Sequence, residues 1–218
     1  AQAHRYWLPL LGLFTGARIN ELCQLNPQQD IREEDGIAFI DITDEGEGDS
    51  AIVRTVKTES SRRRVPLHSE LLRLGFLRYV ERVKAAGHKL LFPGFPPKGD
   101  KASGTAKVWF RKLLASTGLR DTTHRAALVG FHCFRSNFLN RAMNQGELLA
   151  HWLTGHTDGQ VSQVVRGYRG TLELKKKQEI LERITFDLVP LMHSHEGPAE
   201  SPAGPAAAAD RKTASEPL

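Results

Sequence analysis

Cysteines are scarce in this sequence of 218 residues. Cys23 and Cys133 are the only two, and each stands within an apolar helical pattern. Two isolated thiols exclude a disulfide framework and a cysteine-based metal site, and they are typical of a reducing compartment. We therefore expect both to be ordinary core residues.

Segments that would direct the chain to a membrane are also missing. No apolar run approaches the ~20 residues that a membrane span needs, and residues 1–15 lack the cleavage pattern of a signal peptide. The chain is therefore expected to be cytoplasmic, with no membrane partner. An initiator methionine is absent as well, and the sequence opens at Ala1 directly on an apolar segment. We interpret it as a fragment of a longer protein.

Large apolar residues become rare near the C-terminus. Residues 188–218 are rich in Pro, Ala and Ser and offer too little burial to offset the entropy cost of ordering them. We expect one folded domain over residues 1–187 and a disordered tail over 188–218. The net charge is +5, and residues 1–187 hold 28 basic and 21 acidic residues, so the folded part is the basic part. Such a domain favours polyanions such as nucleic acid.

Apolar residues at helical spacing predict a mainly helical chain. The predicted helices cover residues 4–14, 17–25, 69–86, 103–117, 131–144, 146–153, about 159–168, and 172–183. Short β-rich runs separated by turn-prone residues occur at 36–42, 51–57 and 63–67. They predict a small three-stranded antiparallel sheet, and with it an α+β fold.

Six residues with reactive or anion-binding side chains follow one another along the chain. They are Arg18 in TGARINEL, Lys57 between predicted strands, His132 and Arg135 in HCFR, His156 in LTGHT and Tyr168 in RGYRG. The other two tyrosines, Tyr6 and Tyr79, stand in apolar helices, whereas Tyr168 has Arg166, Arg169 and two glycines beside it. Nearby cations favour a phenolate, and glycines permit the close approach of DNA. Tyr168 is therefore the candidate nucleophile.

This ordered series resembles the tyrosine recombinase, or phage integrase, family over residues 4–183. Catalytic domains of the family have an Arg after a Thr-Gly break, a Lys on a β-hairpin, a His-x-x-Arg helix start, a Gly-His pair and a late Tyr. The resemblance implies their helical catalytic fold with its small antiparallel sheet. It also implies cleavage of a DNA strand to a 3′-phosphotyrosine and a free 5′-hydroxyl, then ligation to a partner strand, with no cofactor, metal ion or ATP.

The resemblance also implies partners and a setting. The partners are double-stranded DNA at a specific recombination site, further copies of the chain in a tetramer on that DNA, and an N-terminal DNA-binding domain upstream of this sequence. Such an enzyme is bacterial or phage-encoded, acts at the nucleoid and serves a mobile genetic element such as a prophage. Tyr168 follows His156 by twelve positions, more than is usual in the family, and attack in cis and in trans both fit.

Each site residue takes a role by resemblance. Arg18, Arg135 and His156 bind the scissile phosphate, Tyr168 attacks it, Lys57 is the general acid, His132 is the general base, and Glu21 is the acidic partner of Arg18. Forked guanidiniums suit this task because they stay charged and grip phosphate oxygens through two N–H groups. Losing one such donor typically costs about 10²-fold or more in rate. The reverse assignment of Lys57 and His132 stays open.

Other arginines are candidates for DNA contacts, and other functions compete with recombination. Arg166 and Arg169 flank Tyr168, and Arg62, Arg63 and Arg64 form either a phosphate-binding patch or a solvated strand edge. A type IB topoisomerase would share the chemistry, and a non-catalytic DNA-binding module would share the fold. A metal-dependent nuclease using the acids of residues 41–49 is disfavoured, because a Gly-rich turn is a poor cage for Mg²⁺.

Overall fold

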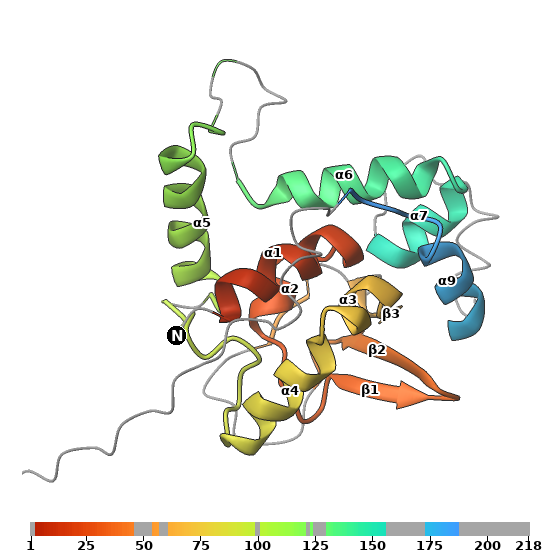
Figure 1. Ribbon diagram of the computed structural model, residues 1–218, viewed down its shortest axis with the longest axis horizontal. Helices are drawn as coiled ribbons and strands as arrows, with labels where there is room; N and C mark the ends of the chain where they lie inside the picture. The colour runs from red at the N-terminus through yellow and green to blue at the C-terminus, as the bar shows by residue number, and fades with distance from the viewer. Residues whose placement is uncertain are drawn as a thin grey trace, which may run out of the picture.

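Helix α1 (Ala3–Thr15) crosses the middle of the molecule, with other helices on either side of it (Figure 1). The computed structural model describes residues 3–45, 54–56, 61–98, 101–120, 123, 130–155 and 173–187. Trp7, Leu11 and Phe14 of α1 are fully buried, at the i, i+4 and i+7 spacing of one helix face. α1 is thus the centre of the hydrophobic core, as the apolar pattern of its sequence predicts.

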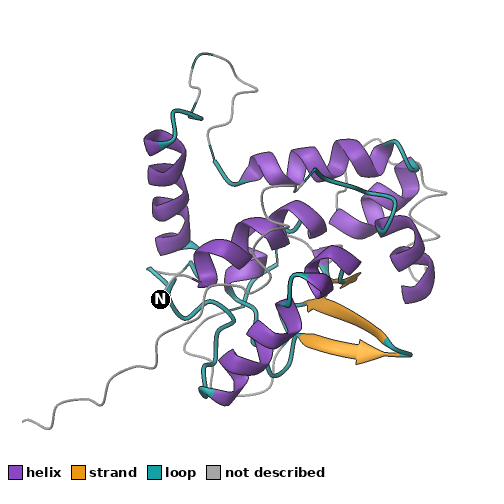
Figure 2. Cartoon of the chain, in the orientation of Figure 1, coloured by secondary structure: helices purple, strands orange, loops and turns teal. Residues whose placement is uncertain are grey.

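A small antiparallel sheet lies beside the helices (Figure 2). Its strands are β1 (Ile31–Glu34), β2 (Ile37–Ile42) and β3 (Arg63–Pro66), in the order β1-β2-β3. The predicted α+β class, mainly helical with a three-stranded antiparallel sheet, is confirmed. Asp35 and Gly36 join β1 to β2 with φ angles of 52° and 75°, the positive values that a two-residue hairpin turn requires.

The strands that make this sheet differ in part from those predicted. The predicted strand at 51–57 is wrong in its described part, since residues 54–56 join no strand. The backbone N–H of Thr55 donates instead to Oε1 of Gln24, at 3.1 Å. The sheet is completed by β1 in place of the predicted strand. Its sequence pattern does not predict a strand, because its only apolar residue is Ile31.

The register of the sheet decides which arginines of β3 face inward. Ile42 pairs with Arg63, and Asp41 pairs with Arg64. Successive side chains of a strand point to opposite faces. Arg63 therefore shares a face with Val65, which is fully buried, and Arg64 lies on the other face, with 43% of its side chain exposed.

The predicted helix over residues 69–86 is interrupted. Gly75, with a φ of 88°, separates α3 (Ser69–Arg73) from α4 (Phe76–Ala85). The other described helices lie where apolar spacing predicts them: α2 (Ile19–Cys23), α5 (Gly104–Ser116), α6 (His132–Met143), α7 (Glu147–Thr154) and α9 (Leu174–Leu181). The predicted helix at about 159–168 and the tail over 188–218 lie outside the described residues.

Both cysteines belong to the core. Cys23 is buried, and Cys133 is half-buried and packs against the buried cluster. Burial raises the pKa of Cys23 to about 12 and also raises the pKa of Cys133, so neither is a thiolate at neutral pH. Across the described ranges of the chain, every helix is too short or too polar to span a bilayer.

Candidate active site

The break between α1 and α2 determines where Arg18 lies. Gly16 follows α1 with a φ of 61°, a conformation that residues with a Cβ rarely adopt. A Cβ on Gly16 would also lie 2.5 Å from the ring of Phe138 on α6, so only glycine permits this approach of the two helices. Arg18 is then the N-cap residue of α2. The Thr-Gly break thus starts α2 close to α6.

Glu21, one helical turn after Arg18, joins two arginines. Its Oε1 accepts a hydrogen bond from Nη1 of Arg18 at 2.7 Å, and its Oε2 accepts one from the Arg18 backbone N–H at 2.8 Å. Oε2 also accepts from Nη2 of Arg63 at 2.9 Å. Glu21 therefore contacts Arg18 on one side and the sheet on the other.

Arg135 connects α6 to the ends of two other helices. Its Nη1 donates to the carbonyl of Gly16 at 2.7 Å, and its Nη2 donates to the carbonyl of Thr154 at 2.7 Å. A guanidinium has five N–H donors, and these two bonds use two of them. Arg135 is only 2% exposed, but it lines the same cavity as Arg18.

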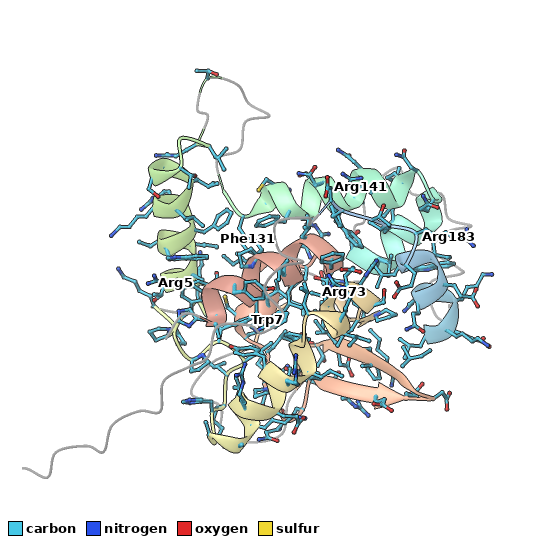
Figure 3. The ribbon with its side chains drawn as sticks, in the orientation of Figure 1. Arg5, Trp7, Arg73, Phe131, Arg141 and Arg183 are labelled. Carbon is cyan, nitrogen blue, oxygen red and sulfur yellow. The ribbon has the colours of Figure 1, made fainter. Side chains whose placement is uncertain are left out.

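That cavity lies between α2, α5 and the start of α6, and its volume is about 500 Å³. Arg18, His132 and Arg135 line it, together with Lys107 and Arg111 of α5; none of the described residues that line it is acidic. Phe131, labelled in Figure 3, precedes α6 and also belongs to the lining. A cavity with this charge suits an anionic group such as a phosphate.

Glu21 and Arg135 both stay ionised at neutral pH. Burial acts to raise the pKa of Glu21, but the charge of Arg63 and hydrogen bonds from Arg63 and Arg18 outweigh burial and lower this pKa to about 2. Burial lowers the pKa of Arg135 to about 10, and the charges of Arg18 and Arg63 act in the same direction. The site therefore has permanent positive charge beside a permanent carboxylate.

Several residues expected in the site lie outside the described residues: Lys57, His156, Tyr168, Arg166 and Arg169. Described residues close to two of them are bound to the site. Before Lys57, the Thr55 hydroxyl accepts a hydrogen bond from Nδ2 of Asn20, a cavity residue, at 3.4 Å. Before His156, the carbonyl of Thr154 is bound by Arg135. Thr55 and Thr154, each two residues before an expected site residue, are thus anchored near the cavity.

Arg63 is not a surface arginine, contrary to both interpretations of the arginine triplet. Its side chain is 4% exposed, and its Nε donates to the carbonyl of Leu153 at 2.8 Å. Its Nη1 donates to the carbonyl of Ser61 at 2.7 Å. With Nη2 bound to Glu21, every nitrogen of this guanidinium has a buried partner, which contradicts the expected phosphate contact. The period-two alternation of the strand, which groups Arg63 with Val65, is a signal that indicates this placement.

Arg62 and Arg64 are exposed, at 42% and 43% of their side-chain surface. Arg62 pairs with Asp44 at 2.6 Å and with Glu45 at 2.8 Å, and Arg64 pairs with Glu34 at 2.8 Å. Exposed pairs of this kind contribute little to stability, so exchanging a carboxylate for a DNA phosphate would cost little. Their contact with DNA stays a prediction.

Two cavity residues were not among those singled out from the sequence. Lys107 and Arg111 stand four residues apart on α5, which puts them on one face of the helix. That spacing was visible within the helix predicted over residues 103–117. Only the packing of α5 beside α2 and α6 shows that this face belongs to the cavity.

The fold and the cavity together define a class of protein. A mainly helical domain with a small antiparallel sheet brings two arginines and a histidine from distant parts of the chain to one basic cavity, which suits an anionic group. The chain belongs to the phage integrase family, whose sequence profile matches residues 2–168.

Two solved structures are similar to this chain. One is the XerH site-specific recombinase bound to a palindromic difH substrate, a post-cleavage complex, with 21% identity over 77% of this chain and 42% of that chain and a TM-score of 0.45. The other is the Tn1549 transposon integrase with a circular intermediate DNA, with 22% identity over 84% and 59% and a TM-score of 0.49. The chain therefore spans less than two thirds of either protein. No curated protein matches it.

Proposed function

We propose that this chain is the catalytic domain of a site-specific DNA recombinase that cuts and rejoins double-stranded DNA through a 3′-phosphotyrosine at Tyr168. The observation that carries the proposal is the basic cavity lined by Arg18, His132 and Arg135. Membership of the phage integrase family supports it. The chain has the residue types of the family's site in the same order, and the last of them, Tyr168, is the nucleophile.

The chemistry of a phosphodiester explains why the cavity is basic. Its negative charge repels a nucleophile, and the pentacoordinate transition state concentrates more charge on the non-bridging oxygens. Arg18 and Arg135 provide fixed donors for these oxygens, and His156 adds another. Because Arg135 is held by the carbonyls of Gly16 and Thr154, its donors need no reorganisation when charge develops. Positive side chains thus take the part that metal ions have in other nucleases.

Two further groups transfer protons. A phenol must lose its proton to attack, and the departing 5′-oxygen must gain one. Lys57 is the proposed acid, since it follows a segment attached to α2 through Thr55. His132, which lines the cavity, is the proposed base. The phosphotyrosine preserves the energy of the broken bond, so ligation needs no ATP.

Phosphate contacts outside the scissile position come from other basic side chains. We assign this task to Lys107 and Arg111 in the cavity, to the exposed Arg62 and Arg64, and to Arg166 and Arg169 beside the nucleophile. Four copies of the chain on one pair of sites, each with an upstream DNA-binding domain, complete the proposed assembly. Its setting is the bacterial nucleoid, in the service of a mobile element such as a prophage.

A suicide substrate tests the proposal directly. A nick just 3′ of the scissile phosphate lets the short product diffuse away, so a covalent protein–DNA adduct accumulates and is seen on a denaturing gel. We expect the adduct to form at an unchanged rate in EDTA, because side chains supply the positive charge. Loss of the adduct in EDTA and its recovery with Mg²⁺ would contradict the metal-free mechanism. DNA binding without any adduct would identify a non-catalytic binding module.

A sulfur-bridged substrate tests which side chain protonates the leaving group. We expect Lys57→Ala to slow cleavage of ordinary DNA, because an unprotonated alkoxide leaves poorly. Replacing the bridging 5′-oxygen by sulfur should restore the rate, since a thiolate leaves without a proton. Arg18→Ala is the control and should not be rescued, because its target oxygens are unchanged. Rescue of His132→Ala in place of Lys57→Ala would reverse the two assignments.

A further inference from the structure

We propose that Arg63 is a positioning residue for DNA cleavage, which orients Arg18 through the carboxylate of Glu21. This inference rests on the proposed function, since it assigns Arg63 a part in the same reaction. Arg63 belongs to β3, and Arg18 begins α2, so the two are 45 residues apart in the sequence. The sheet is thereby coupled to the arginine that faces the phosphate.

The contact between Glu21 and both arginines carries the argument. Arg63 donates to Oε2 of Glu21 at 2.9 Å, which leaves Oε1 directed at Nη1 of Arg18, 2.7 Å away. The side chains of Glu21 and Arg63 are 3% and 4% exposed, whereas that of Arg18 is 25% exposed. The buried Glu21, itself bound by the buried Arg63, therefore holds Arg18, the most exposed of these three side chains.

Two backbone carbonyls hold Arg63 itself in place. They belong to Ser61, just before β3, and to Leu153, next to the last residue of α7. The final carbonyls of a helix lack partners within the helix, and here α7 gives two consecutive ones to arginines, Leu153 to Arg63 and Thr154 to Arg135. The guanidiniums of Arg63 and Arg135 are thus both bound to the C-terminal end of α7.

This placement explains why the residue is arginine. Only a guanidinium presents donors in a rigid fork that can meet three acceptors in different directions. A buried ion pair adds little net stability, because desolvating the charges offsets their attraction, but it can fix one geometry. Without Arg63, Glu21 can still accept from the side chain and the backbone N–H of Arg18, but its carboxylate loses the bond that ties it to the sheet. Arg18 then loses its fixed orientation toward the phosphate.

The expected effect is on the rate of cleavage and not on DNA affinity. Losing a group that orients a catalytic ligand typically costs about 10- to 100-fold in activity. We therefore expect Arg63→Met to slow adduct formation on the suicide substrate by this factor at saturating DNA, with an unchanged Kd. If Arg63 had only a structural role, Arg63→Met would slow adduct formation equally whether or not Arg18 is present.

A double-mutant cycle provides that test. Arg63→Met is combined with Arg18→Ala, and single-turnover rates of adduct formation are measured for both single variants and the double variant. If Arg63 acts through Arg18, its loss should change the rate of Arg18→Ala by no more than about twofold, the usual limit of additivity errors. An equal slowing by Arg63→Met with and without Arg18 would overturn the proposal.

Arg54→Met is the matched control, because Arg54 also forms a buried ion pair, with Asp30, but has no bond to Glu21. Any slowing that Arg54→Met causes should persist in Arg18→Ala. If Arg63→Met does not fold, Arg63→Lys replaces it in the cycle, since an ammonium retains the charge but cannot span three acceptors. Failure of the unchanged chain to form the adduct would overturn the proposed function, whereas a normal adduct with independent effects would overturn only the role of Arg63.

Discussion

Tyr168→Phe is expected to form no covalent adduct with DNA, while its DNA affinity stays that of the unchanged chain. The substitution removes one oxygen, the only atom of the side chain that can attack phosphorus. Affinity depends on the basic side chains that neutralise phosphates, and none of these is altered. The result is read as the loss of the shifted band on a denaturing gel, with binding measured separately under native conditions.

Tyr79→Phe is the matched control for this experiment. The Tyr79 hydroxyl is buried and donates to the carbonyl of Leu91 at 2.6 Å, so it serves the core. Its loss is expected to cost about 1–3 kcal/mol of stability by leaving that carbonyl unsatisfied. The covalent adduct should form as before. An adduct surviving in Tyr168→Phe would contradict the assignment of the nucleophile.

Arg135→Lys is expected to lower the rate of cleavage by about 10²- to 10³-fold, the usual loss when one donor to a developing oxyanion is removed. Lysine retains the positive charge but lacks the planar set of N–H donors of a guanidinium. One ammonium cannot bond the carbonyls of Gly16 and Thr154 and also face the phosphate. The rate is measured in single turnover on the suicide substrate.

Arg141→Lys is the control for this prediction, because it makes the same change on the same helix. The Arg141 guanidinium lies over the ring of Phe186, 4.7 Å from its centroid, and is not among the residues that line the cavity. Its substitution should leave cleavage unchanged. An equal loss in both variants would indicate that α6 tolerates no such change, and that the Arg135 effect is not one of donor geometry.

A change in thermal stability should accompany Arg135→Lys. At least one of the two buried carbonyls loses its donor, at a cost of about 1–3 kcal/mol. For a domain of this size each kcal/mol lowers the melting midpoint by roughly 2–4 °C. Measuring cleavage well below that midpoint separates the loss of catalysis from the loss of folded protein.

The limits of prediction from sequence show in the arginine triplet and in the strands. Arg63 was expected at the surface, because a run of three arginines suggests a patch. The strand register instead places the middle one inside, opposite Ile42. The strand expected at 51–57 is absent from the sheet in its described part, because the Thr55 N–H bonds to the side chain of Gln24, the residue after α2. Both outcomes depend on contacts between segments that are far apart in the sequence.

The sequence by itself determined the family and most of the local structure. The order of Arg18, Lys57, His132, Arg135, His156 and Tyr168 indicated the family, and apolar spacing located most of the helices, because helix faces and reactive groups are properties of short segments. Only the tertiary structure decided how Arg18 is held. Glu21, Arg63 and the end of α7 meet through the pairing of β2 with β3 and the packing of α7 beside it. Such contacts depend on the register and packing of distant segments, which no local pattern encodes.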